Sequence, residues 1–137
     1  MRMIVTGEMD GRSCVVREID YGARGSDFSI VPALDAMVAE LPPRPASNCA
    51  LADLQVPPGK IVWQRVNFPP GGEFPFHVTD TIDCHTIVAG SMELLLDDGV
   101  HRLEAGDCAM VNGVSHGWRV GPEGCTSSLM LIGTPKP

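Results

Sequence analysis

The sequence predicts a mostly β protein of one domain, with an N-terminal arm that carries one short helix. Its 137 residues suffice for a single hydrophobic core. The 15 glycines and 12 prolines favour many short elements joined by turns over long helices. From residue 60 onward, apolar segments recur at a spacing of roughly ten residues, which is typical of an antiparallel sandwich or barrel.

The N-terminal arm is expected to begin with a hairpin. Residues 2–7 and 13–19 are rich in β-branched residues and are joined through Met9-Asp10-Gly11, a favourable hairpin turn. Residues 28–43 predict the helix, because apolar residues recur there with helical spacing before a double proline. The residues on that apolar face are Leu34, Met37, Val38 and Leu41. The following residues, to Lys60, resemble a loop.

The remaining chain predicts the strands of the barrel. Turns are expected at Ala89-Gly90, Asp98-Gly99 and Asn112-Gly113. The expected strands lie within residues 60–68, 81–90, 91–99, 100–113, 116–120 and 126–133. We therefore expect residues 1–58 to form the arm and residues 59–137 the barrel, within a single structural domain.

The net charge and the spacing of the cysteines exclude some classes of function. A net charge of −7 disfavours nucleic-acid binding, because such a surface repels phosphate backbones. No apolar run approaches the length of a membrane span, and the first residues lack the apolar core of a signal peptide. The five cysteines are odd in number and widely spaced, which suits reduced thiols. We expect a cytoplasmic protein that contacts neither nucleic acid nor membrane.

The segment HVTDTIDCH, residues 77–85, holds two of the chain's four histidines and two aspartates. Alternate side chains of a strand share a face, so Asp83 and His85 should point the same way. Polar groups inside a barrel are unfavourable unless they are paired or hold a metal. These two side chains, with His77 across a turn, could converge on one ion. Imidazole with carboxylate suits iron, manganese, zinc, nickel or copper better than magnesium or calcium.

A third histidine strengthens this expectation. His116 follows the Asn112-Gly113 turn and should open a strand at the mouth of the barrel. Trp118, two positions later, shares its face.

These two segments resemble the signature motifs of the cupin superfamily. The first family motif reads G-(x5)-H-x-H-(x3,4)-E-(x6)-G. The matching positions here are Gly71, His77, Thr79, Asp83 and Gly90. The second reads G-(x5)-P-x-G-(x2)-H-(x3)-N. Here Gly106 opens the motif, Asn112-Gly113 replaces the Pro-x-Gly turn, His116 follows one residue earlier than in the family, and Val120 stands near the family Asn. The residue patterns H-x-T-D-T-x-D, from His77, and G-D-x4-N-G-x2-H-x-W, from Gly106, also resemble a subgroup of small single-domain cupins. The resemblance covers residues 60–133 and implies a double-stranded β-helix, or jelly-roll barrel.

The resemblance also implies a metal site, with departures. Family members bind a metal through three histidines and one carboxylate, which maps to His77, Asp83 and His116. Thr79 replaces the remaining histidine, and His85 could restore a fourth ligand or act as an acid or base. The alternative is a polar cluster satisfied by hydrogen bonds and water.

Further residues are candidates for the lining of a pocket. Aromatic and methionine side chains could line it for an apolar or aromatic substrate, or could simply pack the barrel. They are Trp63, Phe74, Phe76, Trp118, Met92 and Met110. We expect Thr79, Trp118, Phe76 and Trp63 to contact substrate. Cys84 alternates away from Asp83 and is expected to pack, and His101 is expected to face solvent.

The function expected from these features is an enzyme that acts on a small organic molecule. One divalent ion (Fe, Mn, Zn or Ni) would support lyase, dehydratase or isomerase chemistry, with His85 and Asp83 as catalytic residues. An Fe(II) dioxygenase or related oxidoreductase is the second interpretation. A non-catalytic small-molecule-binding module is the third, because this fold serves many functions. Small cupins often pair, and we expect a homodimer in which the arm adds to, or packs on, the partner's sheet.

Overall fold

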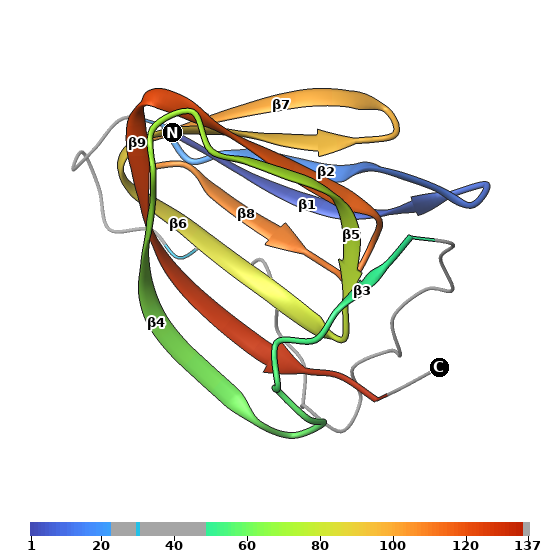
Figure 1. Ribbon diagram of the computed structural model, residues 1–137. Coiled ribbons are helices and arrows are strands. Elements are labelled where there is room, and N and C mark those ends of the chain that lie inside the picture. Colours follow the sequence, from blue (N-terminus) through green and yellow to red (C-terminus); the bar gives the residue numbers. More distant parts are fainter. Residues whose placement is uncertain (23–29, 31–48, 136–137) are drawn as a thin grey trace.

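The protein folds as nine β-strands, which the computed structural model describes for residues 1–22, 30 and 49–135 (Figure 1). The strands are β1 (Arg2–Met9), β2 (Arg12–Asp20), β3 (Leu51–Ala52), β4 (Ile61–Phe68), β5 (Glu73–Thr79), β6 (Thr81–Leu96), β7 (Gly99–Glu104), β8 (Cys108–Val111) and β9 (His116–Gly133). The architecture is a jelly-roll barrel, or double-stranded β-helix, as expected. The helix expected within residues 28–43 lies outside the described residues.

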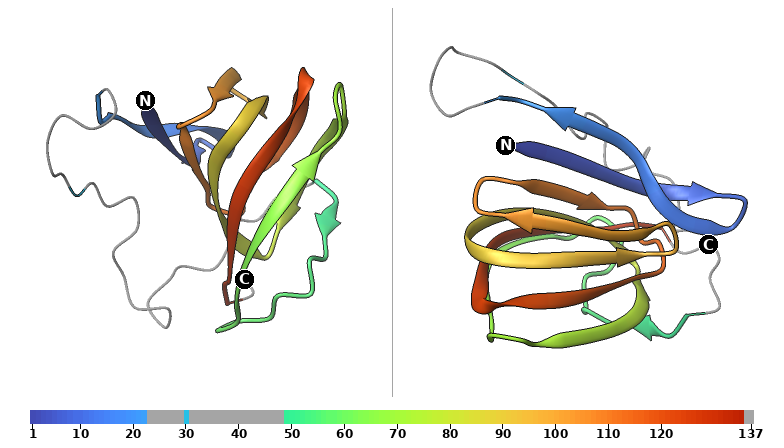
Figure 2. Two further views of the ribbon diagram at one scale, coloured as in Figure 1. Left: turned by 90° about the vertical axis from the view of Figure 1, so that its left-hand side faces the viewer. Right: turned by 90° about the horizontal axis from the view of Figure 1, so that it is seen from above.

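The two longest strands, β6 and β9, form the centre of the sheet. They pair antiparallel from Thr81↔Gly133 to Leu95↔Gly117. The sheet continues from β6 through β8 and β1 to β2, and from β9 to β4 and β5. Figure 2 shows the β1–β2 hairpin at one side of this arrangement and β4 and β5 at the opposite side.

The turn expected at Ala89-Gly90 is a bend inside one continuous strand, which corrects that prediction. The β6–β9 register shifts between Ile87 and Ala89 and again between Gly90 and Met92. Gly90 has φ +72°, and a Cβ there would stand 2.0 Å from the carbonyl oxygen of Gly124 on β9. Bulges with glycine let a strand turn a corner of a barrel without leaving its neighbour. Gly90 therefore does mark a change of chain direction, but the change is a corner within β6 and not a turn between two strands.

The hairpin turn expected between the first two strands is confirmed. Asp10 and Gly11 both have positive φ, at 52° and 74°, as a type I′ turn requires. The β6–β7 hairpin turns one residue earlier than the expected Asp98-Gly99, at Asp97 and Asp98, because Gly99 already pairs with Leu96 as the first residue of β7. One strand was not anticipated: β3 lies in the segment expected to be a loop. The strand that was considered to end at His77 and Thr79 is β5 (Glu73–Thr79).

The N-terminal hairpin joins its own barrel. Met3, Ile4 and Val5 of β1 pair in parallel with Cys108, Ala109 and Met110 of β8. Whether the arm also adds to, or packs on, a partner's sheet stays a prediction. In the described residues β2 is paired only with β1 and ends the sheet. The homodimer stays a prediction.

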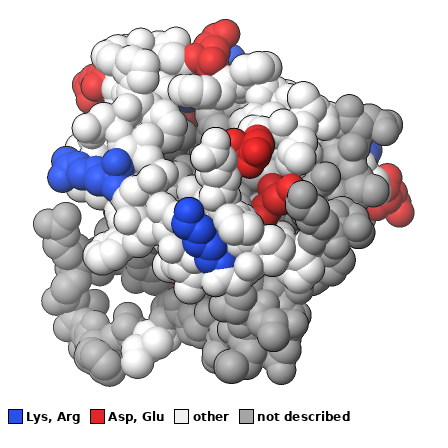
Figure 3. All heavy atoms as spheres, turned by 60° about the horizontal axis from the view of Figure 1, so that its bottom comes forward, with Lys and Arg blue, Asp and Glu red and all other residues white. Residues whose placement is uncertain are grey.

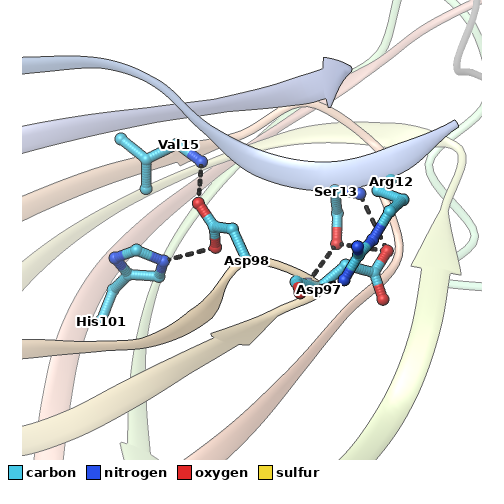
Figure 4. A network of polar contacts seen from close by, with 6 residues as sticks. All are labelled: Arg12, Ser13, Val15, Asp97, Asp98 and His101. Carbon is cyan, nitrogen blue, oxygen red and sulfur yellow. Dashed lines mark hydrogen bonds and ion pairs between the residues drawn. The ribbon is translucent and has the colours of Figure 1, made fainter. Parts of the chain in front are cut away.

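A polar network fastens this hairpin to the β6–β7 turn (Figure 4). Ser13 is buried; its backbone N–H and Oγ–H donate to the Asp97 carboxylate at 2.9 and 3.1 Å, and its Oγ accepts from the Asp97 N–H at 2.9 Å. Asp98 accepts from the Val15 N–H at 2.9 Å and lies 2.7 Å from the Nε2 atom of His101. His101 therefore pairs with a carboxylate, which refines the expectation that it simply faces solvent.

Two apolar clusters occupy opposite faces of the sheet. The larger lies inside the barrel and consists of Ile4, Ile87, Met92, Leu94, Leu96, Leu103, Ala109, Val111, Val114, Trp118, Val120 and Cys125. A smaller cluster on the outer face consists of Val5, Ile82, Met110 and Ile132, with Cys84 and Met130 packed against it. On the surface drawn in Figure 3, charges of both signs are dispersed among uncharged residues. The described residues form no helix long and apolar enough to cross a membrane.

Replacing Gly90 with alanine should destabilise the barrel. The new Cβ would meet the Gly124 carbonyl, and an alanine would be strained at this φ, so we expect a loss of about 3 kcal/mol or more in the free energy of unfolding. Gly11→Ala is the matched control. Gly11 has nearly the same φ, +74°, but a Cβ at that position would meet no atom within 4 Å, so about 1 kcal/mol is expected. Urea unfolding measures both, and equal losses would contradict the corner assignment.

Candidate active site

The structure brings His77 and His116 together on neighbouring strands. They are direct partners in the β5–β9 pairing, and their ring centroids lie 4.4 Å apart. A bulge in β5 between Phe74 and His77 sets this register. His116 is 1% exposed, and His77 is partly buried. The two histidines expected from separate motifs therefore form one pair.

Hydrogen bonds define which nitrogen of each ring is available. The Nδ1 atom of His77 lies 2.8 Å from the carbonyl oxygen of Pro75, and that of His116 lies 2.8 Å from the carbonyl oxygen of Val114. A carbonyl oxygen only accepts, so each Nδ1 carries the proton and each neutral ring keeps Nε2 as an acceptor. Burial, with His77 nearby, lowers the pKa of His116 to about 4, which keeps its ring neutral at pH 7.

His85 is a neutral imidazole in the barrel interior. Its ring lies 4.8 Å from that of Trp118, a member of the inner cluster, and it is 4% exposed. Its Nδ1 lies 3.2 Å from Ser127 Oγ, which donates to the carbonyl oxygen of Thr86 at 3.3 Å. Ser127 therefore accepts from Nδ1, and Nε2 is again the acceptor. Burial, with His116 nearby, lowers the pKa of His85 to about 3.

Asp83 is a buried carboxyl group held by hydroxyls. It is 5% exposed, and the Thr81 hydroxyl donates to its Oδ1. Burial raises the pKa of Asp83 to about 7, although hydrogen bonds from Thr81 and Thr79 act in the opposite direction. A carboxyl group with this pKa exchanges its proton near neutral pH.

The expected metal ligands are only partly assembled. His77 and His116 could supply two imidazole ligands, and their Nδ1 anchors are the kind that orient metal-binding histidines. Asp83 instead faces hydroxyl partners. Among the described residues, no group of three or more histidine, cysteine, aspartate or glutamate side chains is arranged to hold a metal ion. The structure therefore brings together two of the four expected ligands, His77 and His116. The full set of His77, Asp83, His85 and His116 stays a prediction.

The four expected pocket residues divide by face. Thr79 is buried beside Asp83, and Trp118 contacts both His85 and His116, with ring centroids 4.8 and 5.8 Å away. Trp63 is wrongly placed by the prediction. It is 79% exposed, its Nε1 donates to Ser128, and it pairs with Met130 on the outer face.

Phe76 is also wrongly placed, because the bulge in β5 changes the alternation. Phe76 is 40% exposed, and its ring lies over Gly117, where a Cβ would stand 3.4 Å from it. Gly117 alternates with His116 and Trp118 along β9, so Phe76 is on the opposite face from the histidine pair. The β4–β9 register also places the neighbours Gln64 and Arg65 on different faces of the sheet. Gln64 is opposite Leu129, the partner of His85, whereas Arg65 is on the outer face.

Two site residues were missed by sequence reasoning. Thr81 alternates with Asp83 and His85, so strand periodicity alone could have found it. Ser127 lies on β9, 42 residues from His85, and only the strand pairing brings it to the imidazole. Cys84 packs against the outer cluster as expected, and burial raises the pKa of its thiol to about 11, which disfavours a nucleophilic role.

Comparison with known proteins identifies the class. Residues 64–125 match the family model for the cupin domain, so this part of the chain is a cupin domain. An uncharacterized conserved protein with a double-stranded β-helix domain from Klebsiella pneumoniae has the same fold, with a TM-score of 0.50 and 24% identity over 77% of this chain and 95% of that chain.

Fungal proteins are similar over part of the chain. A phomopsin biosynthesis cluster protein, C', from Diaporthe leptostromiformis is 41% identical over 63 residues, which are 45% of this chain and 33% of that protein. The cupin-domain-containing oxidoreductase srdD from Neurospora crassa is 41% identical over 61 residues, 44% of this chain and 31% of that protein. The match thus spans about a third of the length of these curated relatives.

The raised pKa of Asp83 predicts a particular pH dependence of stability in metal-free protein. The pKa of Asp83 in the folded protein, about 7, lies above its usual value of 3.8. The protonated carboxyl therefore contributes its full stability below pH 3.8, and this contribution is lost as the pH rises through about 7. Asp83→Asn should therefore gain stability over the wild type across this window. Burial of His85 and His116 acts in both proteins and cancels in the difference.

Urea unfolding of EDTA-treated protein at pH 5, 6, 7 and 8 measures this difference. Glu123→Gln, at an exposed position, is the control and should change stability by less than about 0.5 kcal/mol at every pH. A constant difference between Asp83→Asn and wild type would show that the carboxyl is not buried as described.

Proposed function

We propose that this cupin domain is an enzyme site for a small organic molecule, and that its chemistry is proton transfer of the lyase, dehydratase or isomerase kind. One observation carries the proposal: a buried carboxyl with a near-neutral pKa shares the barrel face of a neutral, buried histidine. General acid–base catalysis is most effective when the pKa of the group lies near the working pH.

Asp83 and His85 have different roles in the proposed reaction because their pKa values differ. Asp83 gives or takes the proton, because its carboxyl titrates near pH 7. His85 has too low a pKa to be an effective base, so its Nε2 accepts a hydrogen bond from a substrate hydroxyl and orients it. Trp118 supplies an apolar wall beside both histidines, which favours an alkyl or aromatic substituent on the substrate.

The expected proton transfer can be tested without knowing the substrate. The protein is incubated in D2O with a panel of small hydroxy- and ketocarbonyl compounds that carry alkyl or aromatic groups, and deuterium uptake is followed by NMR. Asp83→Asn should lower exchange about 100-fold or more, because it removes the group that carries the proton. His85→Gly should have the smaller effect. Equal exchange by wild type and Asp83→Asn would contradict the role of Asp83.

A divalent transition-metal ion (Fe, Mn, Zn or Ni) is the second part of the proposal. When bound, such an ion would polarise a carbonyl group. The anchored Nδ1 atoms of His77 and His116 support binding at this pair, with Asp83 and His85 as the further ligands only if they turn toward it.

The metal prediction concerns retention after dialysis. His77→Ala/His116→Ala should lose metal that wild type retains, because it removes both available imidazoles of the pair. His101→Ala is the matched control, since His101 pairs with Asp98 away from the site. Elemental analysis of the dialysed proteins, with circular dichroism to verify the fold, gives the answer. Unchanged metal in the double variant would contradict the assignment.

An oxidoreductase is the second candidate function, and the name of the Neurospora crassa relative favours it. Iron content with substrate-dependent oxygen uptake would support this function over proton transfer. Binding of small molecules without either turnover would favour the third interpretation, a non-catalytic binding domain. A homodimer and a cytoplasmic location remain part of the proposal and are tested by sedimentation and by cell fractionation.

A further inference from the structure

A second site is indicated on the outer face of the sheet, where five sulfur-bearing side chains line one pocket of about 270 Å³. They are Met3, Cys84, Cys108, Met110 and Met130. They come from β1, β6, β8 and β9, which are far apart in sequence and adjacent in the sheet. The whole chain has 5 cysteines and 7 methionines, so this concentration of sulfur in one pocket is a specific feature.

Two successive rows of strand partners produce the cluster. In one row, Cys84 of β6 is opposite Met110 of β8 on one side and Met130 of β9 on the other. In the next row, Cys108 of β8 is opposite Met3 of β1 and Thr86 of β6. Directly paired residues share a face of the sheet, so these sulfur atoms project from the same side.

This pocket lies on the other face of β6 from the candidate active site, and the backbone of the same strand separates the two. Cys84 lies between Asp83 and His85 in sequence, so its side chain points to the opposite face of β6. Its neighbours there are Val5, Ile82 and Ile132 of the outer apolar cluster. His85 and Ala109 also line the pocket, but they alternate with Cys84 and Cys108 along their strands, so their side chains belong to the opposite face.

The sulfur atoms are accessible without being fully exposed. Met110 is 6% exposed and forms the floor, whereas both cysteines, Met3 and Met130 are half-buried. Both cysteines are free thiols. The Thr86 hydroxyl lies 3.5 Å from Cys108 Sγ, a position from which it can donate to a thiolate.

We propose that this pocket binds a soft monovalent cation, Cu(I), through the two thiolates of Cys84 and Cys108 and the thioethers around them. Thiolate and thioether ligands select Cu(I), and the carboxylate and imidazole groups preferred by harder ions point elsewhere. A site of two thiolates with thioethers is a different ligand set from a group of three histidine, cysteine or acidic side chains, which the described residues do not form.

A disulfide between the two cysteines is less favoured by the same geometry. Cys84 and Cys108 are diagonal neighbours in the β6–β8 pairing, because Cys108 is opposite Thr86. Diagonal residues of paired strands have Cα atoms about 7–8 Å apart, and a disulfide needs less than about 7 Å. A bridging cation spans the separation without moving the strands.

The test is a competition for Cu(I) with the chromogenic chelator bicinchoninate, under anaerobic and reducing conditions. Wild type should remove one Cu(I) per chain. Cys84→Ser/Cys108→Ser should bind more than about 100-fold more weakly, since the loss of outer-shell partners alone weakens metal sites about 10- to 100-fold. Met110→Leu/Met130→Leu keeps the side-chain volume nearly unchanged and should weaken binding about 10-fold, which separates a built site from simple thiol capture.

Two control variants complete the design. Cys14→Ser removes a half-buried thiol on β2 outside the pocket, and His77→Ala/His116→Ala removes the imidazole pair; both should bind Cu(I) like wild type. If the paired cysteine variant does not fold, as judged by circular dichroism, the methionine variant carries the test. An unchanged Cu(I) affinity in the methionine variant would overturn the proposal and indicate adventitious binding to thiols. A lower Cu(I) affinity in Cys14→Ser or in the histidine variant would also overturn it, because the ion would then bind outside the pocket.

Discussion

The pairing of β6 with β9 is the constraint on which the rest of the structure depends. It runs from Thr81↔Gly133 to Leu95↔Gly117, and it continues around a corner because Gly90 and Gly124 can approach without side chains. Since side chains alternate along a strand, this register decides which residues of β6 enter the barrel. A slip of one residue would bring Cys84 inside and expel Asp83 and His85. The candidate active site and the sulfur pocket are therefore two consequences of one register.

The interior site has a consistent electrostatic character. Burial disfavours the charged form of every titratable group, so it raises the pKa of Asp83 and lowers the pKa values of His85 and His116. Each group has its own hydrogen-bond partner: Thr81 for Asp83, Ser127 for His85 and the carbonyl oxygen of Val114 for His116. Such a site offers hydrogen-bond acceptors and one exchangeable proton in a low-dielectric surrounding. That combination distinguishes this chain from the metal arrangement that its family resemblance implies, because Asp83 is engaged by hydroxyls and Thr79 occupies the place of a histidine.

The N-terminal hairpin contributes to the barrel as an additional pair of strands. Its parallel pairing with β8 covers an edge that would otherwise be open. The network around Ser13, Asp97 and Asp98 then fixes the hairpin to the β6–β7 turn. Partial burial would raise the pKa of Asp98, but hydrogen bonds from His101 and the Val15 N–H outweigh it and lower that pKa overall, which favours the carboxylate in this role. Met3 also reaches the sulfur pocket only because β1 lies beside β8.

The sequence by itself determined the fold class, most strands and the residues of the two histidine motifs. These follow from local physics: alternation of apolar residues, turn-forming Asp-Gly pairs, and polar residues within an apolar strand. The tertiary structure decided everything that depends on register between distant strands. Gly90 marks a corner of the barrel and not a turn, Phe76 and Trp63 lie on the outer face, and Ser127 lies on the inner face beside His85. Strand periodicity specifies two faces, and only the pairing with β9, together with the bulges in β5 and β6, decides which face is inner and which side chains meet there.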